Sequence, residues 1–117
     1  MKLYEIRDIL QATVLTGQDQ MEKTVPAAGG TDIMSDILAA AAVDALFLTG
    51  NTSEEVIDSA VLASVGAVIF VRGKRPEDSV IAMAERHAMP LLMTPFSMFI
   101  ASGRLYMHGL RGLEGSW

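Results

Sequence analysis

The chain has 117 residues, half of them hydrophobic, with a formal net charge of −5 and no cysteine. This length allows one domain with a core of its own but not two. The lack of cysteine excludes disulfides, thiolate zinc sites and thiol nucleophiles, and the acidic balance argues against nucleic-acid binding, which needs a basic surface.

Targeting and membrane signals are missing from the sequence. No apolar stretch approaches the roughly 18 residues that cross a bilayer. Residues 1–8 alternate charged and apolar side chains and lack the hydrophobic centre of a signal peptide. We therefore expect a cytoplasmic protein without membrane contact, and nothing in the composition requires a cofactor.

The first part of the chain predicts one helix and two extended segments. Apolar residues recur at helical spacing over residues 3–11, and residues 13–16 alternate as a short strand does. Residues 23–28 form a second extended segment, and Pro26 places it at a sheet edge because proline cannot donate to a ladder.

The Gly29–Gly30 pair is predicted to break this segment. Thr31 or Asp32 can then cap a helix whose apolar positions follow a period of 3.6 as far as Ala41.

From residue 45 onward the chain repeats one pattern three times: an apolar run, a short turn and an amphipathic helix. The runs are residues 45–48, 67–71 and 91–93. Such uninterrupted apolar runs are typical of strands covered on both faces. The pattern predicts a three-layer α/β fold, a mostly parallel sheet flanked by helices. The three turns would share the carboxyl edge, where such sheets bind ligands.

Capping signals mark the helix starts after each of these strands. Thr52 with Glu55 predicts a capping box, Pro76 suits a first helical position, and Thr94 with Pro95 repeats the same arrangement.

The last predicted helix has two apolar faces. We assign the larger face to the core and expect Met98 and Leu105 on the opposite side, without an intramolecular partner. They form either a homodimer surface or two isolated exposed side chains. Residues 111–117 are expected to be a flexible tail after a single domain of residues 1–110. The face assigned to the core comprises Phe96, Phe99, Ile100, Gly103, Tyr106 and Met107.

Five segments together resemble a DRTGG domain, and the resemblance extends over about residues 3–110. They are residues 29–39, 49–51, 66–69, 90–97 and 103–106. The resemblance implies a fold similar to the N-terminal domain of HPr kinase/phosphorylase. In place of the name-giving Asp-Arg-Thr-Gly-Gly, residues 26–30 read Pro-Ala-Ala-Gly-Gly, so no role of that Asp or Arg carries over.

The family resemblance also implies a kind of function. DRTGG domains occur alone, beside CBS domains in regulated pyrophosphatases and in long phosphotransacetylases, and stand-alone members often accompany iron-only hydrogenase genes. None has an established activity of its own. The resemblance thus implies a non-catalytic regulatory or interaction domain, homodimeric or bound to a protein partner, linked to hydrogenase or acetate metabolism.

A basic turn is the most specific candidate site. Its cations would attract the phosphate of a nucleotide or another phosphorylated ligand, and the helix that follows would add its positive dipole end. The alternative is a solvated turn whose cations are satisfied by Glu77 and Asp78. The spacing excludes a GxxxxGK[ST] phosphate loop. The turn consists of Arg72, Gly73, Lys74 and Arg75.

Hydroxyl and amide side chains follow the first and last of the three strands. Thr49, Asn51, Thr94 and Ser97 would lie along the carboxyl edge and could bind the ribose or base of an adenine nucleotide. Helix capping and turn formation are the alternative roles for these residue types.

No arrangement of residues indicates an enzyme or a metal site. No serine, histidine and aspartate occur in the order of a triad, and the carboxylates gather where first helical turns are expected. His87 and His108 fall near helix ends, where an imidazole complements the helix dipole.

Overall fold

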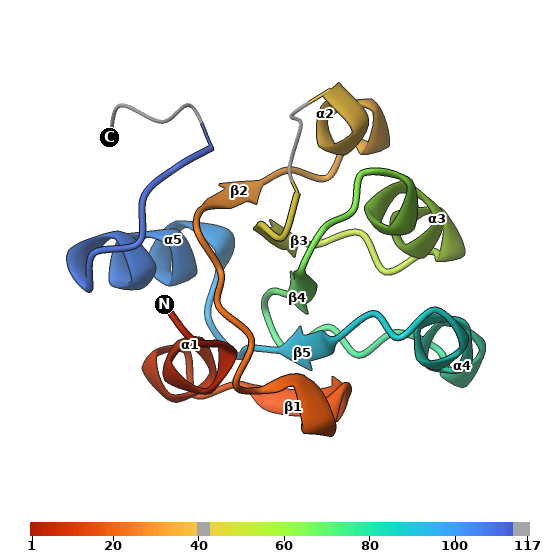
Figure 1. The fold of residues 1–117 in the computed structure, drawn as a ribbon, viewed down its shortest axis with the longest axis horizontal. Coiled ribbons are helices and arrows are strands. Elements are labelled where there is room, and N and C mark those ends of the chain that lie inside the picture. Colours follow the sequence, from red (N-terminus) through yellow and green to blue (C-terminus); the bar gives the residue numbers. More distant parts are fainter. Residues whose placement is uncertain (40–42, 114–117) are drawn as a thin grey trace.

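The computed structural model describes residues 1–39 and 43–113. Within this part of the chain, strands and helices alternate after an initial helix (Figure 1). The helices are α1 (Leu3–Ile9), α2 (Met34–Ala39), α3 (Glu54–Leu62), α4 (Asp78–Arg86) and α5 (Met98–Met107), with a 3-10 turn η1 (Gln18–Gln20). The strands are β1 (Thr13–Thr16), β2 (Ala28–Gly30), β3 (Leu46–Thr49), β4 (Ala67–Phe70) and β5 (Leu91–Met93).

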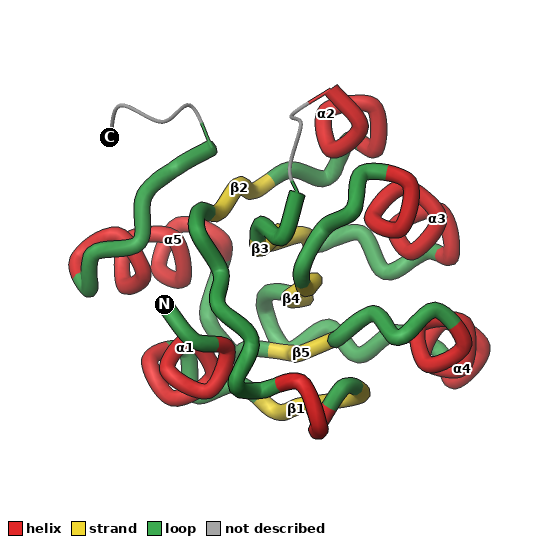
Figure 2. The backbone as a smooth tube through the Cα atoms, viewed as in Figure 1, coloured by secondary structure: helices red, strands yellow, loops and turns green. Residues whose placement is uncertain are grey.

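The strands form one sheet in the order β1-β5-β4-β3-β2 (Figure 2). The four strands β2, β3, β4 and β5 are mutually parallel, and β1 runs antiparallel to β5 at one edge. The predicted mostly parallel sheet is therefore confirmed. Its central strands β3 and β4 are buried at every position, as their uninterrupted apolar runs predict.

Helices cover both faces of the sheet, so the molecule has three layers. In Figure 1, α1 and α5 lie on one side and α2, α3 and α4 on the other. Alternation along β3 separates the two cores: Leu46 and Leu48 pack with α1 and α5, whereas Phe47 packs with α2, α3 and α4. The domain thus has two hydrophobic cores, one on each face of the sheet.

The Gly29–Gly30 pair is a strand and not the predicted break. It pairs in parallel with Phe47 and Leu48 of β3. A Cβ at Gly29 would lie 2.8 Å from Leu113 Cδ1 and 3.1 Å from Phe47 Cε1. A larger residue at position 29 would therefore displace the end of the Leu113 side chain and crowd the Phe47 ring.

Two helices begin slightly later than their sequence signals predict. The N-cap residue of α3 is Ser53, so Thr52 and Glu55 do not form the predicted capping box. The N-cap of α4 is Glu77, which leaves Pro76 outside the helix.

The segment before α2 is organised by a local turn. The Thr31 hydroxyl accepts the N–H of Ile33 at 3.0 Å, and the helix starts at Met34. Ala41, predicted to belong to this helix, lies outside the described residues.

Residues 111–113 run beside the outer edge of β2. The Ala28 N–H donates to the Arg111 carbonyl at 3.0 Å, and the Leu113 N–H donates to the Ala28 carbonyl at 3.2 Å. These three residues of the predicted tail therefore pair with the sheet, and residues 114–117 lie outside the described part.

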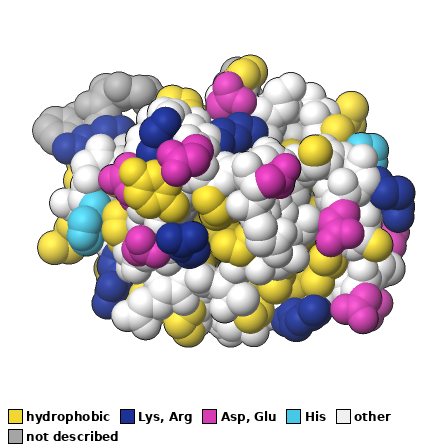
Figure 3. Space-filling model, turned by 60° about the horizontal axis from the view of Figure 1, so that its bottom comes forward, with side chains coloured by type: hydrophobic (Ala, Val, Ile, Leu, Met, Phe, Trp, Pro, Cys, Tyr) yellow, Lys and Arg dark blue, Asp and Glu magenta, His cyan; other side chains and the backbone are white. Residues whose placement is uncertain are grey.

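The surface carries no large area of a single charge on the face that Figure 3 brings forward. Acidic and basic side chains alternate there with small apolar areas. Among the helices described, none is long and apolar enough to cross a membrane.

Candidate functional site

The carboxyl ends of β3, β4 and β5 meet at one edge of the sheet, as the three repeats predict. The turns that follow these strands are in direct contact there. The Arg72 N–H donates to the Phe96 carbonyl at 2.7 Å, and the Gly73 N–H donates to the Thr94 carbonyl at 2.8 Å. The candidate residues after β4 and β5 therefore belong to one connected surface.

The two candidate threonines are buried and have internal partners. Thr49 and Thr94 are both 0% exposed. The Thr94 hydroxyl donates to the Leu10 carbonyl at 2.7 Å and accepts the Phe96 N–H at 3.3 Å. The Thr49 hydroxyl donates to Asp32 Oδ1 at 3.2 Å. Their position corrects the expectation that both hydroxyls face a ligand.

Asn51 and Ser97 shape the local chain. The Asn51 amide donates to the Asp32 carbonyl at 3.4 Å, and its side-chain oxygen accepts the Ser53 N–H at 3.0 Å. The Ser97 hydroxyl caps α5 by accepting the Ile100 N–H at 3.2 Å. These are the capping and turn roles that formed the alternative interpretation.

The basic turn has a left-handed backbone, with φ of 59° at Arg72 and 64° at Gly73. Lys74 Nζ donates to the Gly50 carbonyl at 3.3 Å. Arg75 forms an ion pair with Asp78 at 3.4 Å, as the solvated-turn alternative predicts. The side chains of Arg72 and Lys74 thus lie close to Gly50, while Arg75 turns toward α4.

A carboxylate of the chain itself occupies the centre of this edge. Asp32 Oδ1 accepts the Gly50 N–H at 2.6 Å. Asp32 Oδ1 and Arg72 Nη2 lie 3.4 Å and 3.1 Å from the place where a Gly50 Cβ would be. The Gly50 N–H, a donor that could bind a phosphate oxygen, is therefore already taken by Asp32.

Acidic side chains also line the surface depression at this edge of the sheet. It has a volume of about 380 Å³ and lies between the starts of α3 and α4. Glu54 and Glu77 line it, together with Asn51, Thr52, Ser53, Ser79 and Val80. Two carboxylates at its wall oppose binding of a phosphorylated ligand.

The faces of α5 are the reverse of the predicted ones. Leu105 is only 2% exposed and packs in the core with α1 and β3, and Met98 is half-buried against the same core. Phe99 and Met107, which we assigned to the core, are 84% and 85% exposed. Met98 and Leu105 are therefore not an outward patch.

The exposed side of α5 forms a continuous apolar stripe. Gly103 is at its centre, and among the described residues no atom outside its own stretch of helix backbone lies within 4 Å of the place where its Cβ would be. We call this set the α5 outer face: Phe99, Ile100, Gly103, Tyr106 and Met107, all exposed.

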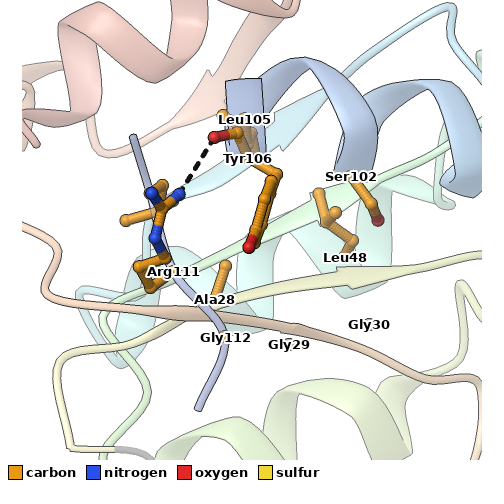
Figure 4. A pocket seen from close by; sticks show the side chains of 10 residues that line it. Ala28, Gly29, Gly30, Leu48, Ser102, Leu105, Tyr106, Arg111 and Gly112 are labelled. Atoms are coloured by element: carbon orange, nitrogen blue, oxygen red, sulfur yellow. Dashed lines mark hydrogen bonds between the residues drawn. The ribbon is translucent and has the colours of Figure 1, made fainter. Parts of the chain in front are cut away.

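A cavity of about 230 Å³ lies between β2 and the C-terminal half of α5 (Figure 4). Glycines of β2 form one side of it, and Tyr106 with Arg111 forms another. The sequence pattern does not predict this cavity, because a Gly29–Gly30 pair that breaks the extended segment would not lie in the sheet. Two glycines inside a strand mark a close approach to the backbone, and this was the available signal.

Metal-binding clusters are not part of this arrangement. Across residues 1–39 and 43–113, no group of three or more histidine, aspartate or glutamate side chains is placed to hold a metal ion. His87 and His108 are the C-cap residues of α4 and α5, as their sequence position predicts.

Comparison with known proteins identifies related domains. The sequence profile of the DRTGG domain matches residues 5–106. The fold is similar to a crystal structure described as the CBS and DRTGG domains of the regulatory region of Clostridium perfringens pyrophosphatase, complexed with its activator diadenosine tetraphosphate. The TM-score is 0.69 at 17% identity, over 89% of this chain and 45% of that chain. No curated protein matches the chain.

Proposed function

Because the chain belongs to the DRTGG domain family, we propose that it is a non-catalytic regulatory domain that acts as a homodimer through the α5 outer face. The observation that carries this proposal is the exposure of four large apolar side chains on one side of α5. The similar pyrophosphatase domain lies in a regulatory region, which supports the regulatory role.

The composition of the α5 outer face favours a second copy of the chain as its partner. In a two-fold symmetric contact, each residue on the axis meets its own copy, so a charge there is unfavourable and a small residue allows the closest approach. Gly103 meets this requirement, with Phe99 and Met107 one turn away on either side. Two copies of α5 can therefore cross at Gly103, each placing large side chains beside the other's glycine.

Gly103 has no structural role within one copy that would require glycine. It lies inside a helix, where glycine costs about 1 kcal/mol relative to alanine. Its φ is not in the left-handed region, and a Cβ there would enter open space. A close contact between the α5 helices of two copies would explain why residue 103 is a glycine.

Sedimentation velocity at micromolar concentration tests the dimer. We expect a dimer for the natural chain and a folded monomer for Gly103→Glu, which places two like charges at the axis. Leu62→Glu is the control, because Leu62 is an exposed apolar residue on α3, and it should remain dimeric. A monomeric natural chain, or a Gly103→Glu variant that still dimerises, would refute the proposal.

The second candidate function is the sensing of an adenine nucleotide. It is favoured by the complex of the similar regulatory region with diadenosine tetraphosphate. A ligand that binds only the folded chain raises the melting temperature. Thermal unfolding with millimolar AMP and ATP tests this function, and an unchanged melting temperature with both would contradict it.

We propose that the regulated process is the one that the family resemblance implies, hydrogenase or acetate metabolism. Iron-only hydrogenase and phosphotransacetylase are the first protein partners to test. Co-sedimentation of purified partners with the natural chain and with Gly103→Glu would show whether a partner binds, and whether it needs the dimer.

A further inference from the structure

We call the cavity between β2 and α5 the slot, and the aromatic ring of Tyr106 forms one of its walls. In Figure 4 the Tyr106 ring stands between Arg111 on one side and Ser102 with Leu48 on the other. The Arg111 guanidinium carbon lies 4.5 Å from the Tyr106 ring centroid and covers one face of that ring. The opposite face of Tyr106 is left as a stacking surface.

The floor of the slot combines backbone with apolar side chains. Gly29 and Gly30 bring β2 to the cavity without side chains of their own, and Leu48, Leu105 and Leu110 supply carbon surface. A Cβ at Gly30 would lie 3.1 Å from Met98 Sδ, so a larger residue at this position would fill part of the space. Such apolar walls around an aromatic face suit a planar ring.

Main-chain polar groups face the slot from the edge of β2. Ladder geometry alternates along a strand, so Ala28 and Gly30 point their N–H and C=O groups away from β3. Those of Ala28 pair with Arg111 and Leu113. Those of Gly30 have no partner among the described residues. One donor and one acceptor therefore stand side by side, as required to bind the edge of a heterocycle such as a nucleobase.

The charge of the side chains that line the cavity indicates which class of ligand it can bind. Among the described residues that line the cavity, Arg111 alone is charged, and no carboxylate is present. This distinguishes the slot from the depression at the carboxyl edge, which Glu54 and Glu77 line. The slot therefore favours a ligand with an anionic group over an amine.

From this combination we infer that the slot binds the nucleobase of a mononucleotide, stacked on Tyr106, with the phosphate toward Arg111. A volume of about 230 Å³ accommodates one base. It is smaller than the roughly 300–1,000 Å³ of pockets that enclose drug-sized ligands. The inference rests on the second candidate function, the sensing of an adenine nucleotide, and places its binding site away from the basic turn.

Isothermal titration calorimetry with AMP, adenosine and ribose 5-phosphate tests the site on the full chain. AMP should bind most tightly, adenosine more weakly because it lacks the anion, and ribose 5-phosphate not detectably. Equal affinities for ribose 5-phosphate and AMP would overturn the assignment of a ring to the slot.

Three substitutions examine the slot itself. Tyr106→Leu removes the stacking ring, and base stacking on an aromatic residue is worth about tenfold in affinity or more. Gly30→Val fills the floor and should abolish binding, and Arg111→Gln should weaken AMP without affecting adenosine. Thermal unfolding of each variant shows whether it is folded.

Arg72→Gln is the matched control, because it removes a cation from the basic turn outside the cavity. We expect unchanged AMP affinity in this variant. If Arg72→Gln loses AMP while Tyr106→Leu keeps it, the slot is refuted and nucleotide sensing itself remains. If AMP gives no binding heat at millimolar concentration, both are refuted.

Tyr106 also belongs to the α5 outer face, so the assay needs a variant that separates ligand binding from dimerisation. Gly103→Glu changes that face at a residue that does not itself line the cavity, although its neighbour Ser102 does. It should bind AMP with unchanged affinity as a monomer. Loss of AMP binding in this variant would overturn the inference that one copy forms the site.

Discussion

Replacing Thr94 by valine should destabilise the fold strongly although it changes one side-chain atom. Thr94 is fully buried, and its hydroxyl connects the turn after β5 with the end of α1, 84 positions away in the sequence. It donates to the Leu10 carbonyl at the end of α1 and accepts the Phe96 N–H before α5. Valine keeps the shape of the side chain and removes both hydrogen bonds.

The expected cost follows from these two partners. Leaving a buried donor or acceptor without a partner costs about 1–3 kcal/mol. The Leu10 carbonyl is the more deeply buried partner, so we expect Thr94→Val to lower the free energy of unfolding by about 2 kcal/mol. For a chain of 117 residues this corresponds to a fall of about 8 °C in melting temperature.

Urea and thermal unfolding followed by circular dichroism measure this effect. Thr52→Val is the matched control, since it is the same chemical change at a threonine that was predicted to cap a helix but does not. The control should change the free energy of unfolding by less than about 0.5 kcal/mol. Equal stability of the two variants would refute the role assigned to the Thr94 hydroxyl.

Three further predictions concern stability and are measured by the same unfolding assays. Leu105→Ala should cost about 2–5 kcal/mol because it empties the core beneath α5. Met107→Ala on the other face should cost under about 0.5 kcal/mol, and similar losses would contradict the observed faces. Asp32→Asn weakens the bond to the Gly50 N–H and should cost about 1 kcal/mol. A neutral result there would show that this bond contributes little. Gly17→Ala should cost at least about 1 kcal/mol, because φ is 88° and the new Cβ would lie 2.8 Å from Pro90 Cα. Natural stability in this variant would show that the turn relaxes.

The two faces of α5 show where the sequence pattern stops being informative. Both faces are apolar, and the pattern assigned the bulkier one to the core. The structure buries the less bulky side, where Ala101 is fully enclosed and Met98 lies against Gly30 of β2. Small side chains allow the helix to lie close to the sheet, and periodicity contains no information about that distance.

The candidate site could be predicted only in part, and the reason is similar. Three repeats of strand, turn and helix were enough to place the turns after β3, β4 and β5 at one edge. The partners of the polar residues there come from far along the chain: Thr94 bonds to Leu10, 84 positions away, and Gly50 bonds to Asp32. Local sequence signals cannot show that such groups are already satisfied.

The pairing of residues 111–113 with Ala28 bears on aggregation through the edge of the sheet. A strand at the edge of a sheet offers unpaired main-chain groups, onto which a strand of any other molecule can add without limit. β2 is such an edge and is short, apolar and uncharged. The last described residues occupy part of it from within the same chain, because Gly112 pairs in parallel with Ala28. Open-ended growth of the sheet through β2, which leads to aggregates, is thereby hindered by the chain's own residues.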